Sequence, residues 1–385
     1  MNFYDEESFP NSTYVNVPTT TTYDSNTTAS RGITTTAALS TLFNTESFTN
    51  TTIVVDAFLF KNYPPVILKT GFVFLLVFAV FGVFANAVSM LAIVRCSKLK
   101  NATTSFLVNL CFSDLLFCGT STPFAVSVFW YGGWNYSHST CVVYGVSRFF
   151  NVGSSVLTVM VIAINRLVMI AQPTRYKQTF TPGNNLLIIT GIWLLSFSLV
   201  IWPTARVWGR FAWDPYTGTC SVVPHNGKSS KQFTLTFVYI VPTIVFLSCY
   251  GRIFCIVRSS NKNLRQHNSG RRRSTAYVAS MVTLPAEKNK KQVKKREKNV
   301  RLLRMVLVIF VTFTLCYLPL LLLKAFRILN HCPAVQVTAY MTFYLSGCLN
   351  PVIYICMSRE YRKAYSDLFS RDKASPDVTA SRDLE

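Results

Sequence analysis

Long uncharged stretches alternate with short charged segments along the chain, and seven of the stretches are long enough to cross a membrane. A helix needs roughly 20 apolar residues to cross a bilayer core, where its backbone must satisfy its own hydrogen bonds. The predicted spans are residues 66–94, 104–130, 141–170, 186–206, 232–257, 303–326 and 334–357. The expected fold class is therefore an all-α membrane protein, a seven-transmembrane helix bundle over 66–357.

The positive charge is concentrated in one segment between the fifth and sixth spans. The chain carries a net charge of +22, yet residues 258–304 alone hold 15 basic and 2 acidic residues. A nucleic-acid-binding surface would spread its charge over a folded domain, and the chain has no zinc, homeodomain or basic-zipper motif. We therefore expect no nucleic-acid partner, and we interpret residues 258–302 as a basic third cytoplasmic loop.

The basic residues also predict the orientation in the membrane. Basic residues follow the first, third and fifth spans, so the positive-inside rule places these connections in the cytosol. Residues 1–65 are then an extracellular tail, rich in Thr and Ser and expected to be disordered, and 370–385 a cytoplasmic tail. Glycosylation sequons predicted to be outside begin at Asn11, Asn26, Asn50 and Asn135. The expected location is the plasma membrane.

Several polar residues and prolines within the spans are not required by hydrophobicity. They are Asn86, Asp114, residues 164–166 (INR), Trp193, Pro203, Pro242, Tyr250, Phe313, residues 316–319 (CYLP) and residues 350–354 (NPVIY). In this order, each on its own helix, they resemble the signature of rhodopsin-like (class A) G-protein-coupled receptors. Segments such as 164–182 and 358–369 resemble the invertebrate "trapped in endoderm" and Moody receptor group more narrowly, which implies a role in cell migration, polarity or barrier formation.

The resemblance implies a disulfide between Cys141 and Cys220, which both face the oxidising side in the predicted topology. The alternative is two free thiols. It also implies a sodium and water pocket in which Asp114, Asn151 and Ser155 hold a cation, since a carboxylate in the membrane interior needs a polar environment. The alternative there is a protonated Asp114 in a structural hydrogen-bond network. No other cofactor is expected.

An activation switch is implied along the inner half of the bundle. Its residues are Asn165, Arg166, Tyr250, Phe313, Tyr317, Pro319, Asn350, Pro351 and Tyr354. Most relatives carry an acid before the arginine, whereas Asn165 can only hydrogen-bond Arg166, so we expect appreciable basal activity. The alternative is an arginine that only extends to the membrane interface. Pro319 removes a backbone hydrogen bond and should kink the sixth span.

Basic residues dominate the expected ligand cavity. Arg148 lies two turns into the third span, and Lys324 and Arg327 are expected at the rim, with Tyr317 and Tyr344 deeper. Three bases near an apolar cavity favour an acidic or lipid-like ligand. A peptide ligand is the alternative, and Lys324 and Arg327 are alternatively interpreted as extending to the outer surface.

The cytoplasmic segments suggest further partners. The resemblance implies a heterotrimeric G protein, arrestin and receptor kinases, while Ser274 and Thr275 fit a basophilic kinase site. Basic residues at 288–304 should continue the sixth helix and could bind anionic membrane lipids, at about 1 kcal/mol per residue. Residues 358–369 predict a short amphipathic helix on the inner membrane surface, with Tyr361, Tyr365 and Phe369 at four-residue spacing.

Other classes of protein fit the sequence less well. The four His residues are scattered without metal-ligand spacing, and no Ser or Cys nucleophile has an evident base, so we expect no enzyme. A membrane transporter would need internal repeats or broken helices, which the sequence does not show. An adhesion scaffold would depend on the N-terminal tail rather than on Arg166. The function predicted is a receptor that passes an extracellular anionic or lipid-like signal to G proteins.

Overall fold

The computed structural model describes residues 63–96, 102–214, 218–274, 286–325 and 332–371. Over 260–274, 286–299, 324–325 and residue 371 it describes the backbone alone. The helices are α1 (Pro65–Arg95), α2 (Ala102–Leu116), the π-helical turn η2 (Phe117–Ser121), α3 (Thr122–Tyr131), α4 (His138–Ala171), α5 (Pro173–Thr179), α6 (Pro182–Thr204), α7 (Lys231–Ser274), α8 (Ala286–Ala325), α9 (Pro333–Met357) and α10 (Arg359–Arg371). Strands β1 (Arg210–Asp214) and β2 (Thr219–Val223) lie between α6 and α7.

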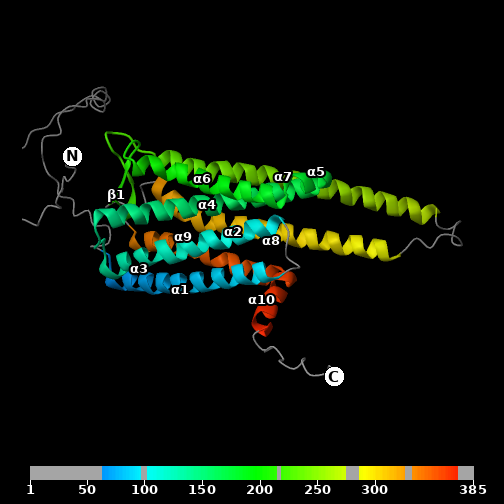
Figure 1. Ribbon diagram of the computed structural model, residues 1–385, viewed down its shortest axis with the longest axis horizontal. Helices are drawn as coiled ribbons and strands as arrows, with labels where there is room; N and C mark the ends of the chain where they lie inside the picture. The colour runs from blue at the N-terminus through cyan, green and yellow to red at the C-terminus, as the bar shows by residue number, and fades with distance from the viewer. Residues whose placement is uncertain (1–62, 97–101, 215–217, 275–285, 326–331, 372–385) are drawn as a thin grey trace, which may run out of the picture. The chain divides into compact units, whose positions relative to one another are not determined.

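The long helices lie side by side, and α4 is central among them (Figure 1). α4 contacts α2, α6 and α7, while α9 contacts α1 and α8. The hairpin of β1 and β2 rests on α4 at one end of the bundle, and α10 packs on α1 and α9 at the other. Residues far apart in sequence are thereby brought together inside the bundle.

The predicted spans are confirmed as helices. In the described residues, six continuous helical segments are long and apolar enough to cross a membrane. They are α1, α2 through α3, α4, α6, Lys231–Ser259 of α7 and Val300–Leu323 of α8. α9 qualifies only together with α10, across a bend of 100°. The seventh predicted span coincides with α9, so the seven-helix prediction is correct.

Polar side chains share the inside of the bundle with an apolar core, and many large apolar side chains also lie on its outside, unlike the surface of a soluble protein. Asn86, Ser113 and Asn165 are fully buried, whereas Leu186 is 66% exposed and Phe254 64% exposed. Exposed apolar surface on this scale is unfavourable in water but stable against lipid tails, where unpaired polar groups are costly. The distribution of side chains therefore fits a bundle surrounded by lipid.

Local sequence signals set several helix ends. Ser137 caps α4, its hydroxyl accepting from the Thr140 backbone N–H at 3.3 Å, and Thr181 caps α6 by accepting from Asn184 N–H at 3.3 Å. Gly132 ends α3 in the left-handed region with φ of 67°, a conformation that costs glycine little because it lacks a Cβ.

The second span changes its helical form near its middle. η2 is a single π-helical turn between α2 and α3. Pro123 follows it within the first turn of α3 and has no N–H to donate to the preceding turn, which favours a break in the regular pattern. The hydrophobic pattern predicts this span as one continuous helix, so the turn was not predicted.

Two other features differ from the sequence analysis. The antiparallel hairpin, in which Trp213 pairs with Cys220, was not predicted. Much of residues 258–302, interpreted as a loop, is helical, because α7 reaches Ser274 and α8 begins at Ala286. The prediction that the basic segment continues the sixth helix is therefore confirmed for the backbone.

Candidate functional site

A buried carboxylate joins three helices in the middle of the bundle. Asp114 of α2 is 4% exposed. Its Oδ1 accepts a hydrogen bond from Ser155 Oγ of α4 at 2.9 Å, and its Oδ2 accepts from Asn350 Nδ2 of α9 at 2.6 Å. Nearby, Asn86 of α1 donates to the Gly347 backbone carbonyl at 2.8 Å. This network holds the inner halves of these helices together.

Asn151 does not contact Asp114 as the resemblance implied. Its Nδ2 donates to Ser147 Oγ at 3.2 Å, and its Oδ1 is buried without a hydrogen-bond partner in the described residues. The carboxylate and hydroxyl oxygens of Asp114 and Ser155 are hard donors that suit a sodium ion, and the amide oxygen of Asn151 has the same chemistry. Sodium binding stays a prediction.

The inner end of α4 carries a buried arginine without an acidic partner. Arg166 is 2% exposed, its Nε has no hydrogen-bond partner in the described residues, and one Nη donates to Met169 Sδ at 3.6 Å. The expected hydrogen bond between Asn165 and Arg166 is absent, because Asn165 Oδ1 instead accepts from Thr103 Oγ1 of α2 at 2.6 Å. Asn165 therefore ties α4 to α2 and leaves the guanidinium unrestrained.

The other inner-end residues of the predicted switch are not bonded to Arg166. The Tyr250 hydroxyl of α7 donates to the Leu303 backbone carbonyl of α8 at 3.0 Å. The Tyr354 hydroxyl has no partner in the described residues, and its ring lies 5.6 Å from that of Tyr361 of α10, centroid to centroid. Tyr361 is thus buried in the bundle, rather than facing the membrane as its spacing suggested.

Aromatic stacking connects the outer cavity to the lower part of α8. Phe313 and Tyr317 stack with centroids 4.1 Å apart, and Tyr317 meets Phe343 of α9 edge-on at 5.0 Å. Pro319 lies inside α8 one half-turn above Tyr317. The predicted packing switch is therefore assembled as one aromatic cluster, on the side of α8 that faces the cavity.

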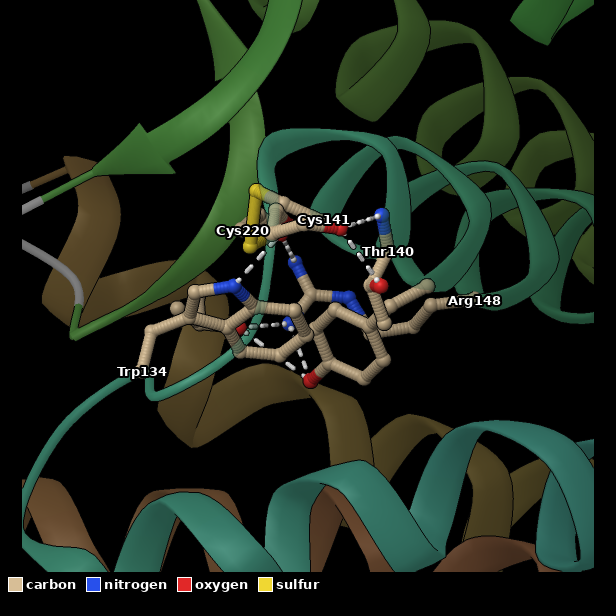
Figure 2. The surroundings of a disulfide bond; sticks show 8 residues. Trp134, Thr140, Cys141, Arg148 and Cys220 are labelled. Carbon is tan, nitrogen blue, oxygen red and sulfur yellow. Dashed lines mark hydrogen bonds between the residues drawn. A yellow bond between two sulfur atoms is a disulfide. The ribbon is translucent and has the colours of Figure 1, made fainter. Parts of the chain in front are cut away.

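Arg148 lies at the outer end of α4, directly below the disulfide between Cys141 and Cys220 (Figure 2). It is 4% exposed, and one Nη donates to Thr219 Oγ1 at 2.9 Å and to the Tyr144 hydroxyl at 3.4 Å. The other Nη donates to the Cys220 backbone carbonyl at 3.2 Å. All of these acceptors are neutral, and no carboxylate in the described part of the chain pairs with this guanidinium.

Arg148 lines a mostly apolar cavity of about 60 Å³ between α4, α7, α8 and α9. The lining residues on α4 are Arg148, Phe149 and Val152; those on α7 are Thr234, Leu235, Val238 and Tyr239; the rest are Tyr317, Leu320, Leu321 and Phe343. Tyr317 therefore lines the cavity as predicted. Tyr344 is reached only through Tyr144, whose hydroxyl lies 2.8 Å from its own.

The outer end is further held by contacts that begin just before α1. The Tyr63 hydroxyl donates to Gln336 Oε1 of α9. Burial raises the pKa of Tyr63 to about 12, so the hydroxyl keeps its proton at neutral pH. Lys231 at the start of α7 pairs with Asp214 of β1 at 2.8 Å. These contacts fasten α1 to α9 and the hairpin to α7.

A comparison with known families identifies the chain. Residues 85–354 match the 7 transmembrane receptor (rhodopsin family). The chain belongs to this family. The match covers every span from the middle of α1 to Tyr354, so Asp114, Arg166 and Pro319 belong to a rhodopsin-family receptor rather than to an enzyme.

Individual relatives agree with the family. The receptor is 29% identical over 326 residues to the G-protein coupled receptor moody of Drosophila melanogaster, an alignment that covers 74% of this chain and 48% of the relative. It is 30% identical over 298 residues to Protein trapped in endoderm-1 of the same organism, covering 76% of each chain. The chain thus spans about half the length of the Moody relative. Squid rhodopsin shares the fold, with a TM-score of 0.66 at 20% identity over 80% of this chain and 87% of that one.

As a rhodopsin-family member the protein is a multi-pass membrane receptor. Some predicted site residues lie outside the described residues or their described side chains. These are Asn11, Asn26, Asn50, Ser274, Thr275, Lys324 and Arg327. Asn135, between α3 and α4, is exposed.

Thr219, Tyr144 and Tyr239 were not predicted from the sequence, because nothing in their local pattern marks them as neighbours of Arg148.

Proposed function

We propose that this receptor responds to an anionic, lipid-like extracellular ligand whose acidic group binds Arg148. The observation that carries the proposal is the position of Arg148, a buried guanidinium that lines an apolar cavity and has only neutral acceptors. A buried charge without a counter-charge is costly. A carboxylate or phosphate in the cavity would offset that cost through charge-assisted hydrogen bonds.

The apolar lining supports the lipid-like part of the ligand. Apart from Arg148 and Thr234, the cavity presents aliphatic and aromatic side chains, such as Val152, Leu320 and Phe343. Burying a hydrocarbon against them is favourable by about 25 cal/mol per Å². The hairpin presents Thr219 and the Cys220 carbonyl to Arg148, which positions the guanidinium before any ligand arrives.

Nucleotide exchange in membranes that contain the full chain and a panel of G proteins tests this proposal. The probes are oleoyl lysophosphatidate and dodecanoate, with mono-oleoyl glycerol as an uncharged compound of similar chain. We expect the two anions to raise exchange and Arg148→Gln to weaken their potency at least thirtyfold, as expected when one partner of a buried charge pair is removed. Arg210→Gln, at the exposed start of β1, is the matched control and should keep the wild-type response. Equal responses to charged and uncharged probes would contradict the proposal.

At the inner end, we propose that basal exchange is appreciable, because no acid among the described side chains holds Arg166. Arg166→Ala should abolish this exchange, since Arg166 is the side chain that would meet the incoming G protein.

Arrestin and receptor kinases are proposed as further partners, with the N-terminus outside the plasma membrane and the C-terminus in the cytosol. We infer a role in cell migration, polarity or barrier formation, which the likeness to Moody and Protein trapped in endoderm-1 supports.

A further inference from the structure

A second, smaller cavity continues the outer one toward the inside of the bundle. It measures about 20 Å³ and lies between α4, α7 and α8. The two cavities share Val238 and Tyr239, which line both of them. On α4 the lining passes from Arg148 in the upper cavity to Met160 in the lower one, a distance of roughly 18 Å along the helix at 1.5 Å per residue. The lower cavity has no charged residue in its lining.

Tyr239 lines both cavities and is also bonded to α8. Its hydroxyl donates to the Thr314 backbone carbonyl at 3.1 Å, and its ring lies 6.0 Å from that of Tyr317. On the same face of α7, three turns further in, Tyr250 donates to the Leu303 carbonyl of α8. Two tyrosine hydroxyls therefore hold α7 against α8, and the outer one is in contact with the ligand cavity.

The size of the cavities makes the position of Tyr239 important. An anion with a short chain fits between Arg148 and Tyr239 and leaves the tyrosine in place. A chain that extends roughly 12 Å, the rise from Arg148 to Val156 along α4, must displace the Tyr239 side chain to enter the lower cavity. Displacing it breaks the hydrogen bond to the Thr314 carbonyl, and α8 then has one contact fewer to α7.

We propose that Tyr239 determines chain-length specificity: single-chain anions that end above it bind without activating, and longer ones that pass it release α8. This inference rests on the proposed function, because it takes the acidic group to be at Arg148. Tyr239 is a positioning residue, since it passes occupancy of the lower cavity to α8 through one hydrogen bond. The ligand class is thereby narrowed to anions with a single long hydrocarbon chain.

The test uses saturated carboxylates of increasing length on membranes that contain the full chain and its G protein. The series is butanoate, octanoate, dodecanoate and hexadecanoate, with their methyl esters as uncharged controls. We expect dodecanoate and hexadecanoate to activate, and octanoate to compete with dodecanoate without activating. Tyr239→Phe keeps the ring but removes the hydroxyl, so it should raise basal exchange about fivefold, equivalent to about 1 kcal/mol, and turn octanoate into an agonist. Tyr136→Phe, which removes a hydroxyl from the exposed outer loop, is the matched control and should change neither.

Filling the lower cavity provides a second, independent variant. Val156→Phe should remove activation by dodecanoate while octanoate still binds, and Met160→Trp fills the same cavity from its half-buried edge if the first variant does not reach the cell surface. Activation that is independent of chain length, or unchanged in Tyr239→Phe and in both filling variants, would overturn the role of Tyr239 while leaving the proposed function intact. No response or competition from any carboxylate or lysophosphatidate would overturn both.

Discussion

Arg148 and Arg166 lie on the same helix and both are buried. Neither pairs with an acid in the part of the chain that the structure describes, yet their surroundings differ. Arg148 is 4% exposed and donates to Thr219, Tyr144 and the Cys220 carbonyl. Arg166 is 2% exposed, and it has one weak contact to a sulfur and an Nε without a partner. The outer arginine is held by three neutral acceptors, whereas the Nε of the inner one has no partner among the described residues.

This difference follows from what surrounds each end of α4. At the outer end, the disulfide brings a hairpin over the helix, and the hairpin's Cys220 carbonyl and Thr219 hydroxyl accept from Arg148. At the inner end, the neighbouring Asn165 is already bonded to Thr103 and has no acceptor to offer. Buried hydrogen-bonding groups without partners cost about 1–3 kcal/mol each. Arg166 is therefore the less satisfied of the two arginines and the easier to rearrange.

The largest expected effect comes from removing the disulfide that attaches the hairpin to α4. Replacing both Cys141 and Cys220 by Ser should lower the stability of the outer end by about 2–4 kcal/mol and abolish the response to oleoyl lysophosphatidate, because two acceptors of Arg148 lie on the hairpin. Thermal unfolding of the solubilised receptor and nucleotide exchange measure the two effects. Cys332→Ser, which removes an exposed free cysteine, is the control. A parallel loss of basal exchange would show that the two ends are not independent.

A smaller effect is expected from removing a single hydrogen-bond acceptor of Arg148. Thr219→Val keeps the shape of the side chain but leaves one Arg148 N–H without its 2.9 Å partner. Dose-response curves for oleoyl lysophosphatidate should shift about tenfold to higher concentration, as a lost hydrogen bond to a charged group predicts. Thr204→Val at the end of α6 removes a hydroxyl that donates only to the Val200 carbonyl and should leave the curve in place. An unchanged curve in Thr219→Val would mean that the hairpin does not position Arg148.

The smallest effect is expected from placing an acid next to Arg166 at the inner end. Asn165→Asp places a carboxylate beside the unsatisfied guanidinium of Arg166, so the closed arrangement should gain stability and basal exchange should fall about fivefold. Basal exchange of the unstimulated receptor is the measurement, and Asn184→Asp at the exposed start of α6 provides the control. Basal exchange that stays the same or rises would refute the idea that the missing acid loosens this end.

The spans were predictable because hydrophobicity along the chain determines them directly. The pairs Asp114 with Ser155 and Cys141 with Cys220 followed from the resemblance, which carries information about distant contacts that local patterns lack. The hairpin was not predictable, since the pairing of Trp213 with Cys220 depends on the disulfide and on α4 beneath it.

Side-chain partners were harder to predict than helices. Asn151 and Asn165 each have several oxygen-bearing neighbours, and only packing decides that they bond Ser147 and Thr103. Tyr361 and Tyr365 of α10 have the spacing of a membrane-facing surface, but Tyr361 is buried against Tyr354 and Tyr365 bonds Ser89 of α1. Periodicity shows that these residues share a face, and it does not show what that face meets.

The π-helical turn in the second span affects how the outer half of that span is aimed. One extra residue in a turn rotates everything beyond it by roughly 100° about the helix axis. Asp114 lies before the turn and faces Asn350, while Phe124 lies beyond it and meets Trp134 and Tyr144 below the hairpin. The turn thus lets the outer half of the span rotate about the helix axis independently of the inner half. Evolution can therefore reorient the outer half, and alter the ligand preference, without moving the carboxylate that holds the inner bundle together.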